Sequence, residues 1–278
     1  MKKNVALVLS SGGARGLAHI GAIEELERRG YCITSIAGCS MGALIGAMYA
    51  AGKLAEVKEW MVQLDKKKIL SLVDFSFSLN HLVKGEKVMD ALKEIVPDVN
   101  IEDLPIPYAA VATDWNSGKE VVFKKGSLYE AVRSSISIPL FFNPVRKGEM
   151  LLVDGGLVNG LPLNRVARVK GDLLVGVNVS THDYKEEKLM SDIIDKKTLA
   201  KSLPAAIVKR IMDYQEGLGL NYMTLLSRTI SIMLEQNTRQ QIIISKPDIA
   251  VQVQMKRYGG NDYDKAAEIS LIGENKMR

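Results

Sequence analysis

The sequence predicts an α/β protein, a three-layer α/β/α sandwich with a mainly parallel central sheet. Short apolar runs of buried-strand type alternate along the chain with segments whose apolar residues recur at helical spacing. Such alternation favours parallel strands joined by helices that cover both faces of the sheet. The 278 residues are 47% hydrophobic and 25% charged, which is enough to bury one large core. We therefore expect a single domain over residues 1–278.

The elements follow in order from this periodicity. Residues 5–9 form a β-branched and leucine-rich strand, and a helix with an apolar face runs from Leu17 to Gly30. Ser127 and Glu130 form a capping box for a short helix that ends near Ser135. Further strands are expected at 108–114, 120–123, near 151, at 173–179 and at 249–253, with helices at 86–96, at 218–234 and after residue 262, and a loop or lid at 70–84.

A loop of small residues separates the first strand from the first helix. Residues 10–16, SSGGARG, carry little side-chain bulk, so their backbone N–H groups can approach a ligand closely at the start of a helix. The loop is suited to an anion or to a developing negative charge. Dinucleotide binding is the alternative, but Ser11 departs from G-x-G-x-x-G and no acidic residue follows the second strand. A Walker-type GK[ST] motif is also absent.

A second motif, G-x-S-x-G, occupies residues 38–42, GCSMG. The apolar pair Ile36 and Ala37 precedes it, and apolar residues at helical spacing follow it. Strand, sharp turn and helix are the context of a nucleophile elbow, which exposes a serine hydroxyl at the end of a sheet. Ser40 is therefore a candidate nucleophile, and a purely structural glycine-rich turn is the alternative.

Asp154 is the candidate base for this serine. It follows the apolar run 150–153 directly, and Gly155 and Gly156 leave space beside it. An aspartate at the end of a buried strand can reach a neighbouring strand's elbow. An ordinary Asp-Gly turn is the alternative, which the presence and order of the other two motifs make less favourable.

Together these blocks resemble the bacterial patatin-like phospholipase family. The matching pieces are SGGARG at 11–16, GCSMG at 38–42, SSISIP at 134–139 and DGG at 154–156, within residues 5 to about 165. Ser10 and Ser11 stand where the family more often has glycine. The resemblance implies the same three-layer fold.

The resemblance also implies a mechanism and a site. In that family a serine and an aspartate act as a dyad without histidine, so Ser40 is the expected nucleophile and Asp154 its base. The amides of Gly12, Gly13 and Ala14 are the expected oxyanion hole. We expect no cofactor and no metal.

Arg15, the next residue of the loop, has two open roles. It contacts the substrate or it anchors the loop.

A Ser40, Asp154 and His182 triad is a rival arrangement, because the three residues occur in the order of an α/β-hydrolase. However, His182 lies in the polar stretch STHDYKEEK, and the glycine-rich loop is not of the His-Gly-Gly-Gly type. His19 is expected to pack near the loop, and His81 lies in a loop-like segment. No two histidines have metal-ligand spacing.

The function that these residues favour is a serine acyl hydrolase acting on lipid esters, with phospholipid or lysophospholipid as the first candidates. Two alternatives stay open. One is an acyltransferase that passes the acyl group to an acceptor other than water, and the other is a non-catalytic lipid-binding protein of the same fold. Cys39, beside Ser40, is expected to be a small packing residue.

Charge and hydropathy suggest where the protein works. The N-terminal apolar run is too short for a signal peptide and no stretch approaches membrane-spanning length, which favours the cytoplasm. The net charge is +5, and residues 196–210 hold five cations and no acid. The region 185–215 is therefore a candidate lid or contact with anionic membrane at its inner face, with a solvated helix as the alternative. Nucleic acid is not expected as a partner. The oligomeric state is open.

Overall fold

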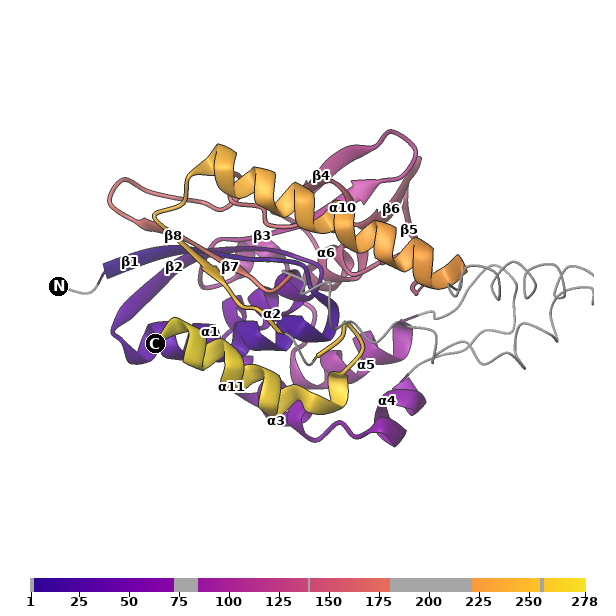
Figure 1. The fold of residues 1–278 in the computed structure, drawn as a ribbon, viewed down its shortest axis with the longest axis horizontal. Coiled ribbons are helices and arrows are strands. Elements are labelled where there is room, and N and C mark those ends of the chain that lie inside the picture. Colours follow the sequence, from indigo (N-terminus) through magenta and orange to yellow (C-terminus); the bar gives the residue numbers. More distant parts are fainter. Residues whose placement is uncertain (1–2, 73–84, 140, 181–221, 256–257) are drawn as a thin grey trace, which may run out of the picture.

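The computed structural model describes residues 3–72, 85–139, 141–180, 222–255 and 258–278, and a single sheet runs through them (Figure 1). Its eight strands lie in the order β5-β6-β3-β2-β1-β7-β8, with β4 paired to β3. The strands are β1 (Lys3–Leu9), β2 (Tyr31–Cys39), β3 (Tyr108–Asp114), β4 (Lys119–Phe123), β5 (Val145–Lys147), β6 (Met150–Asp154), β7 (Leu173–Asn178) and β8 (Ile249–Gln252).

The sheet is parallel through most of its width and antiparallel at one end. β1, β2, β3, β7 and β8 pair in parallel, whereas β4, β5 and β6 join through antiparallel ladders. The connections from β3 to β4 and from β5 to β6 are too short for a crossover helix, so these strands return as hairpins. The predicted α/β class is confirmed, and the antiparallel end is an addition to it.

β1 lies in the middle of the sheet and is buried on both faces. Val5, Leu7 and Leu9 belong to the main hydrophobic core, whereas Ala6 and Val8 pack on the other face. Successive side chains of a strand point to opposite faces, so each face of β1 needs its own cover of helix or chain. The near-continuous apolar run at 5–9 is the sequence counterpart of this double burial.

Helices and connecting chain supply that cover on each face. α10 lies across one face of the sheet, and α1, α2 and α11 lie on the other (Figure 1). The α-helices are α1 (Ala18–Arg28), α2 (Met41–Ala50), α3 (Leu54–Val62), α4 (Lys66–Leu72), α5 (Glu86–Ile95), α6 (Leu128–Ser135), α7 (Gly156–Asn159), α10 (Tyr222–Ser245) and α11 (Ala266–Met277). Short 3₁₀ turns occur at η1 (Gly13–Leu17), η2 (Ile101–Asp103) and η4 (Tyr263–Lys265).

α1 and α11 pack with their backbones in close contact. A Cβ added to Gly21 would lie 2.0 Å from the carbonyl oxygen of Ser270, and one added to Gly273 would lie 1.9 Å from that of Ala18. Neither position can accept a side chain without separating the helices. The C-terminal helix thus forms part of the layer that covers β1 and β2.

Most boundaries agree with the sequence prediction, with four corrections. The helix expected at 218–234 extends to Ser245 in α10, whose described part begins at Tyr222. Helical structure starts earlier than Leu17, because Gly13–Leu17 forms a 3₁₀ turn before α1. The capping box is half formed: Ser127 Oγ accepts from the Glu130 N–H at 3.0 Å, but the Glu130 carboxylate pairs with Lys147 at 2.9 Å. A loop is expected at 70–84, but residues 70–72 form the end of α4. Residues 73–84 lie outside the described residues.

Several predictions fall on residues that the structure does not describe. His81, His182 and the region 185–215, including the basic stretch 196–210, lie outside the described residues. Among the helices that are described, none combines the length and hydropathy needed to span a bilayer.

Candidate active site

Ser40 sits in a sharp turn between β2 and α2. Its backbone has φ 55° and ψ −125°, in a region that a residue with a side chain rarely adopts. The turn needs glycine at both flanking positions, because the backbone passes too close there for a side chain. A Cβ at Gly38 would lie 2.3 Å from the Gly42 carbonyl oxygen, and one at Gly42 would lie 2.4 Å from that of Leu9. The predicted strand, turn and helix of the G-x-S-x-G motif are therefore present, with the strained residue at the serine.

A second serine holds the turn in place. The backbone N–H of Ser40 donates to Ser135 Oγ at 2.9 Å, and the Ser135 hydroxyl donates to the Val111 carbonyl at 2.6 Å. Ser135 is completely buried at the end of α6, so both bonds are sheltered from water. One hydroxyl thus connects the elbow to β3.

Asp154 arrives at the same edge of β3 from the opposite direction. β2 pairs with β3 up to Cys39 opposite Val111, and β6 pairs with β3 from Leu152 to Asp154 opposite Ala112. β4 occupies the other edge of β3 over this stretch, so β2 and β6 must share one edge. The two strands therefore meet end to end, and Asp154 lies beside the elbow.

The Asp154 carboxyl is buried, with only 4% of the residue exposed. Oδ1 accepts from the Gly156 N–H at 2.8 Å and lies 3.9 Å from Cys39 Sγ. Oδ2 is buried and makes no hydrogen bond of ordinary geometry within the described chain. The Ser40 hydroxyl is close enough to favour the ionised form of this carboxyl.

Burial sets the basicity of this carboxyl. Loss of hydration raises the pKa of Asp154 to about 6, against the opposing effects of Ser40, the Gly156 N–H and Cys39. A carboxyl with this pKa is mostly ionised near pH 7, yet it binds a proton more strongly than an ordinary aspartate. Asp154 has the chemistry of a general base for the adjacent hydroxyl.

The segment SSISIP supports both candidate residues. Besides Ser135, which holds Ser40, the carbonyl of Ser137 accepts from the Asp154 N–H at 2.9 Å. Thr113 Oγ1 donates to the Asp154 carbonyl at 2.9 Å. The sequence motif drew attention to this segment without giving its residues a role, because their partners belong to other strands.

The glycine-rich loop is fixed at some of its amides and open at others. The Ser10 N–H donates to the Val177 carbonyl at 3.1 Å, the Ser11 N–H to Gly160 at 2.9 Å and the Ala14 N–H to Gly260 at 2.8 Å. The N–H groups of Gly12 and Gly13 donate to no residue that the structure describes. The three-donor oxyanion hole predicted from the sequence therefore needs correction, because the Ala14 amide is engaged by Gly260.

Arg15 and His19 both contact the loop. Arg15 is buried and donates from Nε to the Gly12 carbonyl at 3.3 Å, which supplies the loop-anchoring contact expected as one of its two roles. His19 is buried, as predicted, with Nε2 2.9 Å from the Ser10 carbonyl oxygen. Burial lowers the pKa of His19 to about 4, so the imidazole is neutral near pH 7.

Cys39 and Tyr263 complete the surroundings of Asp154. Cys39 is fully buried, and burial together with the Asp154 charge raises its thiol pKa, which agrees with a packing role rather than a nucleophilic one. Burial and the Asp154 charge also raise the pKa of Tyr263 to about 12. Tyr263 was not predicted as a site neighbour, because it lies far along the chain in η4.

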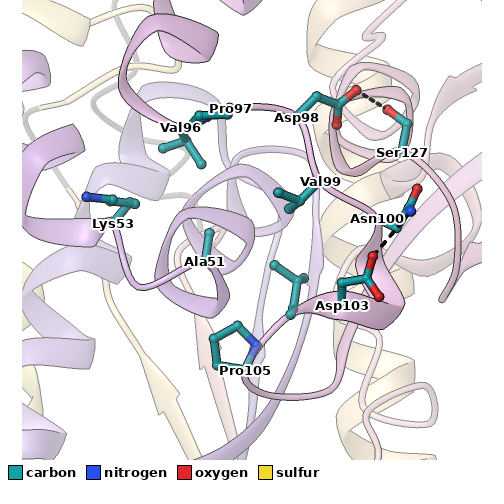
Figure 2. A pocket seen from close by; sticks show the side chains of 11 residues that line it. Ala51, Lys53, Val96, Pro97, Asp98, Val99, Asn100, Asp103, Pro105 and Ser127 are labelled. Carbon is teal, nitrogen blue, oxygen red and sulfur yellow. Dashed lines mark hydrogen bonds between the residues drawn. The ribbon is translucent and has the colours of Figure 1, made fainter.

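A hollow of about 530 Å³ lies elsewhere, between the end of α2 and the connection from α5 to η2 (Figure 2). Its polar groups already have partners: Asp98 accepts from Ser127 at 2.7 Å, and Asn100 donates to Asp103 at 3.2 Å. Neither Ser40 nor Asp154 lines it. In the part of the chain that is described, no group of three or more His, Cys, Asp or Glu side chains could hold a metal ion.

The fold and the facing side chains define an α/β/α protein with a G-x-S-x-G elbow beside a buried aspartate. A family model described as patatin-like phospholipase matches residues 7–167, which is more than half of the chain. The chain belongs to the patatin-like phospholipase family. The matched range includes Ser40, Asp154 and the glycine-rich loop, and it ends before α10, β8 and α11.

Relatives extend this comparison. An uncharacterized NTE family protein of Mycobacterium bovis is 48% identical over 176 residues, covering 63% of this chain and 49% of that protein. The neuropathy target esterase of Drosophila melanogaster is 32% identical over 187 residues, covering 65% of this chain and 13% of that protein. The match thus spans about half or less of these relatives' length. The crystal structure of VipD from Legionella pneumophila aligns at a TM-score of 0.48 and 16% identity, over 99% of this chain and 66% of that one.

Proposed function

We propose that this protein is a serine acyl hydrolase acting on lipid esters, with phospholipid or lysophospholipid as substrate, through a dyad of Ser40 and Asp154. The observation that carries the proposal is the pairing of a strained, elbow-held serine with a buried carboxylate of raised pKa. Oδ2 of that carboxylate is free to take a proton. Membership of a phospholipase-like family supports the lipid ester as substrate.

Acylation begins at the Ser40 hydroxyl. Its Oγ forms a bond to the ester carbonyl carbon while its proton passes to Asp154 Oδ2, and the carbonyl oxygen becomes an oxyanion. The free N–H groups of Gly12 and Gly13 stabilise that oxyanion. The tetrahedral intermediate then collapses, the ester C–O bond breaks, and the leaving alcohol takes the proton from Asp154.

Deacylation repeats these roles with water. Asp154 accepts a proton from a water molecule whose oxygen attacks the acyl-Ser40 carbonyl carbon, and a second oxyanion forms at the same donors. Collapse releases the fatty acid, and the proton returns from Asp154 to Ser40. The carboxyl alternates between base and acid, for which a pKa near 6 is better suited than an ordinary aspartate value.

A fluorophosphonate probe followed by peptide mapping tests the nucleophile. We expect the label on Ser40, and we expect Ser40→Ala to lose both labelling and hydrolysis of a short-chain ester. Ser134→Ala is the matched control, because Ser134 is also a buried serine but donates only to the Glu130 carbonyl within α6. A label on another residue, or full activity of Ser40→Ala, would contradict the assignment.

The substrate is tested separately with phospholipid and lysophospholipid vesicles and mass spectrometry of the products. We expect free fatty acid from the wild type and none from Ser40→Ala. Labelling of Ser40 without fatty-acid release from either lipid would contradict the lipid assignment while leaving the nucleophile in place. Transfer of the acyl group to an added alcohol in preference to water would instead identify an acyltransferase.

A further inference from the structure

Gly12 and Gly13 lie between two fixed points of the loop. The Ser11 amide is bound to the Gly160 carbonyl on one side, and the Ala14 amide is bound to the Gly260 carbonyl on the other. Glycines lose more conformational freedom on ordering than other residues, so a loop that carries two of them needs external restraints. Donors stabilise a transition state best when they are held in place before the reaction.

The restraint at Ala14 comes from a segment far along the chain. The Gly259 N–H donates to Asp262 Oδ2 at 2.8 Å, and the Tyr258 hydroxyl donates to Glu268 Oε2 at 2.6 Å. These bonds form a turn, residues 258–262, that presents the Gly260 carbonyl to the loop. The contact is close, because a Cβ added to Gly13 would lie 2.6 Å from the Gly260 oxygen.

The turn also leads into the surroundings of the base. It precedes η4, whose Tyr263 is close enough to Asp154 for the carboxylate charge to affect its phenol. It lies outside residues 7–167, the range that the family model matches. The site therefore contains a contact that the matched range does not supply.

We propose that the turn 258–262 positions the oxyanion loop, with the Gly260 carbonyl holding the Ala14 N–H so that the N–H groups of Gly12 and Gly13 stay directed at the substrate. The proposal rests on the proposed hydrolase function. Gly260 touches neither substrate nor reacting atoms in this arrangement, and it acts through the loop. The turn is thus a positioning element, and Asp262 and Tyr258 maintain its shape.

Amide hydrogen exchange measured by NMR on the full chain tests the contact directly, without substrate. In the wild type we expect the Ala14 amide to exchange at least tenfold more slowly than those of Gly12 and Gly13. Asp262→Ala combined with Tyr258→Phe should accelerate Ala14 exchange at least tenfold. The same variant should lower kcat for a soluble short-chain ester about tenfold, with KM within twofold of the wild type.

Two controls separate positioning from folding. Asp262→Asn, with Tyr258 unchanged, keeps a side-chain oxygen for the Gly259 N–H. This variant should keep slow exchange of the Ala14 amide and a kcat within threefold of the wild type. Gly260→Ala keeps the carbonyl, and its Cβ would meet open space, so it should behave like the wild type.

Three results would overturn the proposal: fast Ala14 exchange in the wild type, unchanged exchange in the double variant, or faster exchange with unchanged or higher kcat. Failure of the proposed function is recognised independently, by the absence of probe labelling at Ser40.

Discussion

Ser40 and Asp154 approach one edge of β3 from the parallel and the antiparallel part of the sheet, and they are held there in different ways. In the parallel part, backbone geometry sets the chemistry: Ser40 has a positive φ, and the loop offers N–H groups rather than side chains. At the antiparallel end, burial of the Asp154 carboxyl raises its pKa and so sets the chemistry. The comparison teaches that the proposed dyad would take its nucleophile from backbone strain and its base from desolvation of a carboxyl.

The two parts also bury titratable groups with opposite consequences. His19, under the loop, has its pKa lowered to about 4, and Asp154 has its pKa raised to about 6. Burial favours the neutral form in each case. Neutral histidine is the dominant form near pH 7, whereas neutral aspartic acid is not, so only Asp154 retains an unfavourable charge under those conditions.

The largest effect is expected from Asp154→Asn, which removes the proposed base at the antiparallel end and keeps the shape of the side chain. The amide oxygen can still accept from Gly156, but the side chain cannot take the proton of Ser40. We expect kcat for a short-chain ester to fall at least about 100-fold, within the usual range for loss of a general base. Asp172→Asn is the control, because Asp172 is an equally buried aspartate immediately before β7. Activity of Asp154→Asn within tenfold of the wild type would break the comparison.

Ser135→Ala should have an intermediate effect, because it acts on the elbow from the parallel side. It leaves the Ser40 N–H and the Val111 carbonyl without their shared hydroxyl partner. We expect a loss of about 1–3 kcal/mol in the free energy of unfolding and a roughly tenfold lower kcat. Urea denaturation and steady-state kinetics measure the two. Ser134→Ala, next to it in the same helix, should leave kcat within twofold; equal losses in both variants would show that α6 packing alone matters.

The smallest effect on activity is expected from His19→Gln, which keeps an N–H donor for the Ser10 carbonyl and should leave kcat within tenfold of the wild type. Its stability relative to the wild type should change with pH in the opposite direction to that of Asp154→Asn. Urea denaturation of both variants between pH 4 and 8 measures this.

The signs follow from proton binding. Because the folded pKa of Asp154 exceeds the unfolded value, the wild type loses stability as pH rises from about 4 to above 6, and Asp154→Asn should gain about 2–3 kcal/mol relative to it. Because the folded pKa of His19 is lowered, the wild type loses stability as pH falls from about 6.5 to 4, and His19→Gln should gain a similar amount there. Parallel curves for the two variants would contradict the stated burial effects.

The sequence was informative where the signal is local. The elbow at 38–42 could be predicted because its glycines, serine and flanking strand and helix are contiguous, and Asp154 could be predicted from the strand before it. The engagement of Ala14 could not, because its acceptor, Gly260, lies near the other end of the described chain. The hydrogen bonds of Ser135 and Ser137 could not be assigned either, because they depend on which strands meet at β3.

The backbone contact between α1 and α11 has a consequence for how the protein is made. A ribosome releases α1 early, whereas the helix that packs on Gly21 and Ala18 emerges only after residue 265. Contacts of such sequence separation form late, since a long loop must close before they give any stabilisation. We therefore expect the face of α1 that α11 covers to stay exposed until synthesis has passed α11, and the Ala14 amide of the glycine-rich loop to reach the Gly260 carbonyl only late in folding.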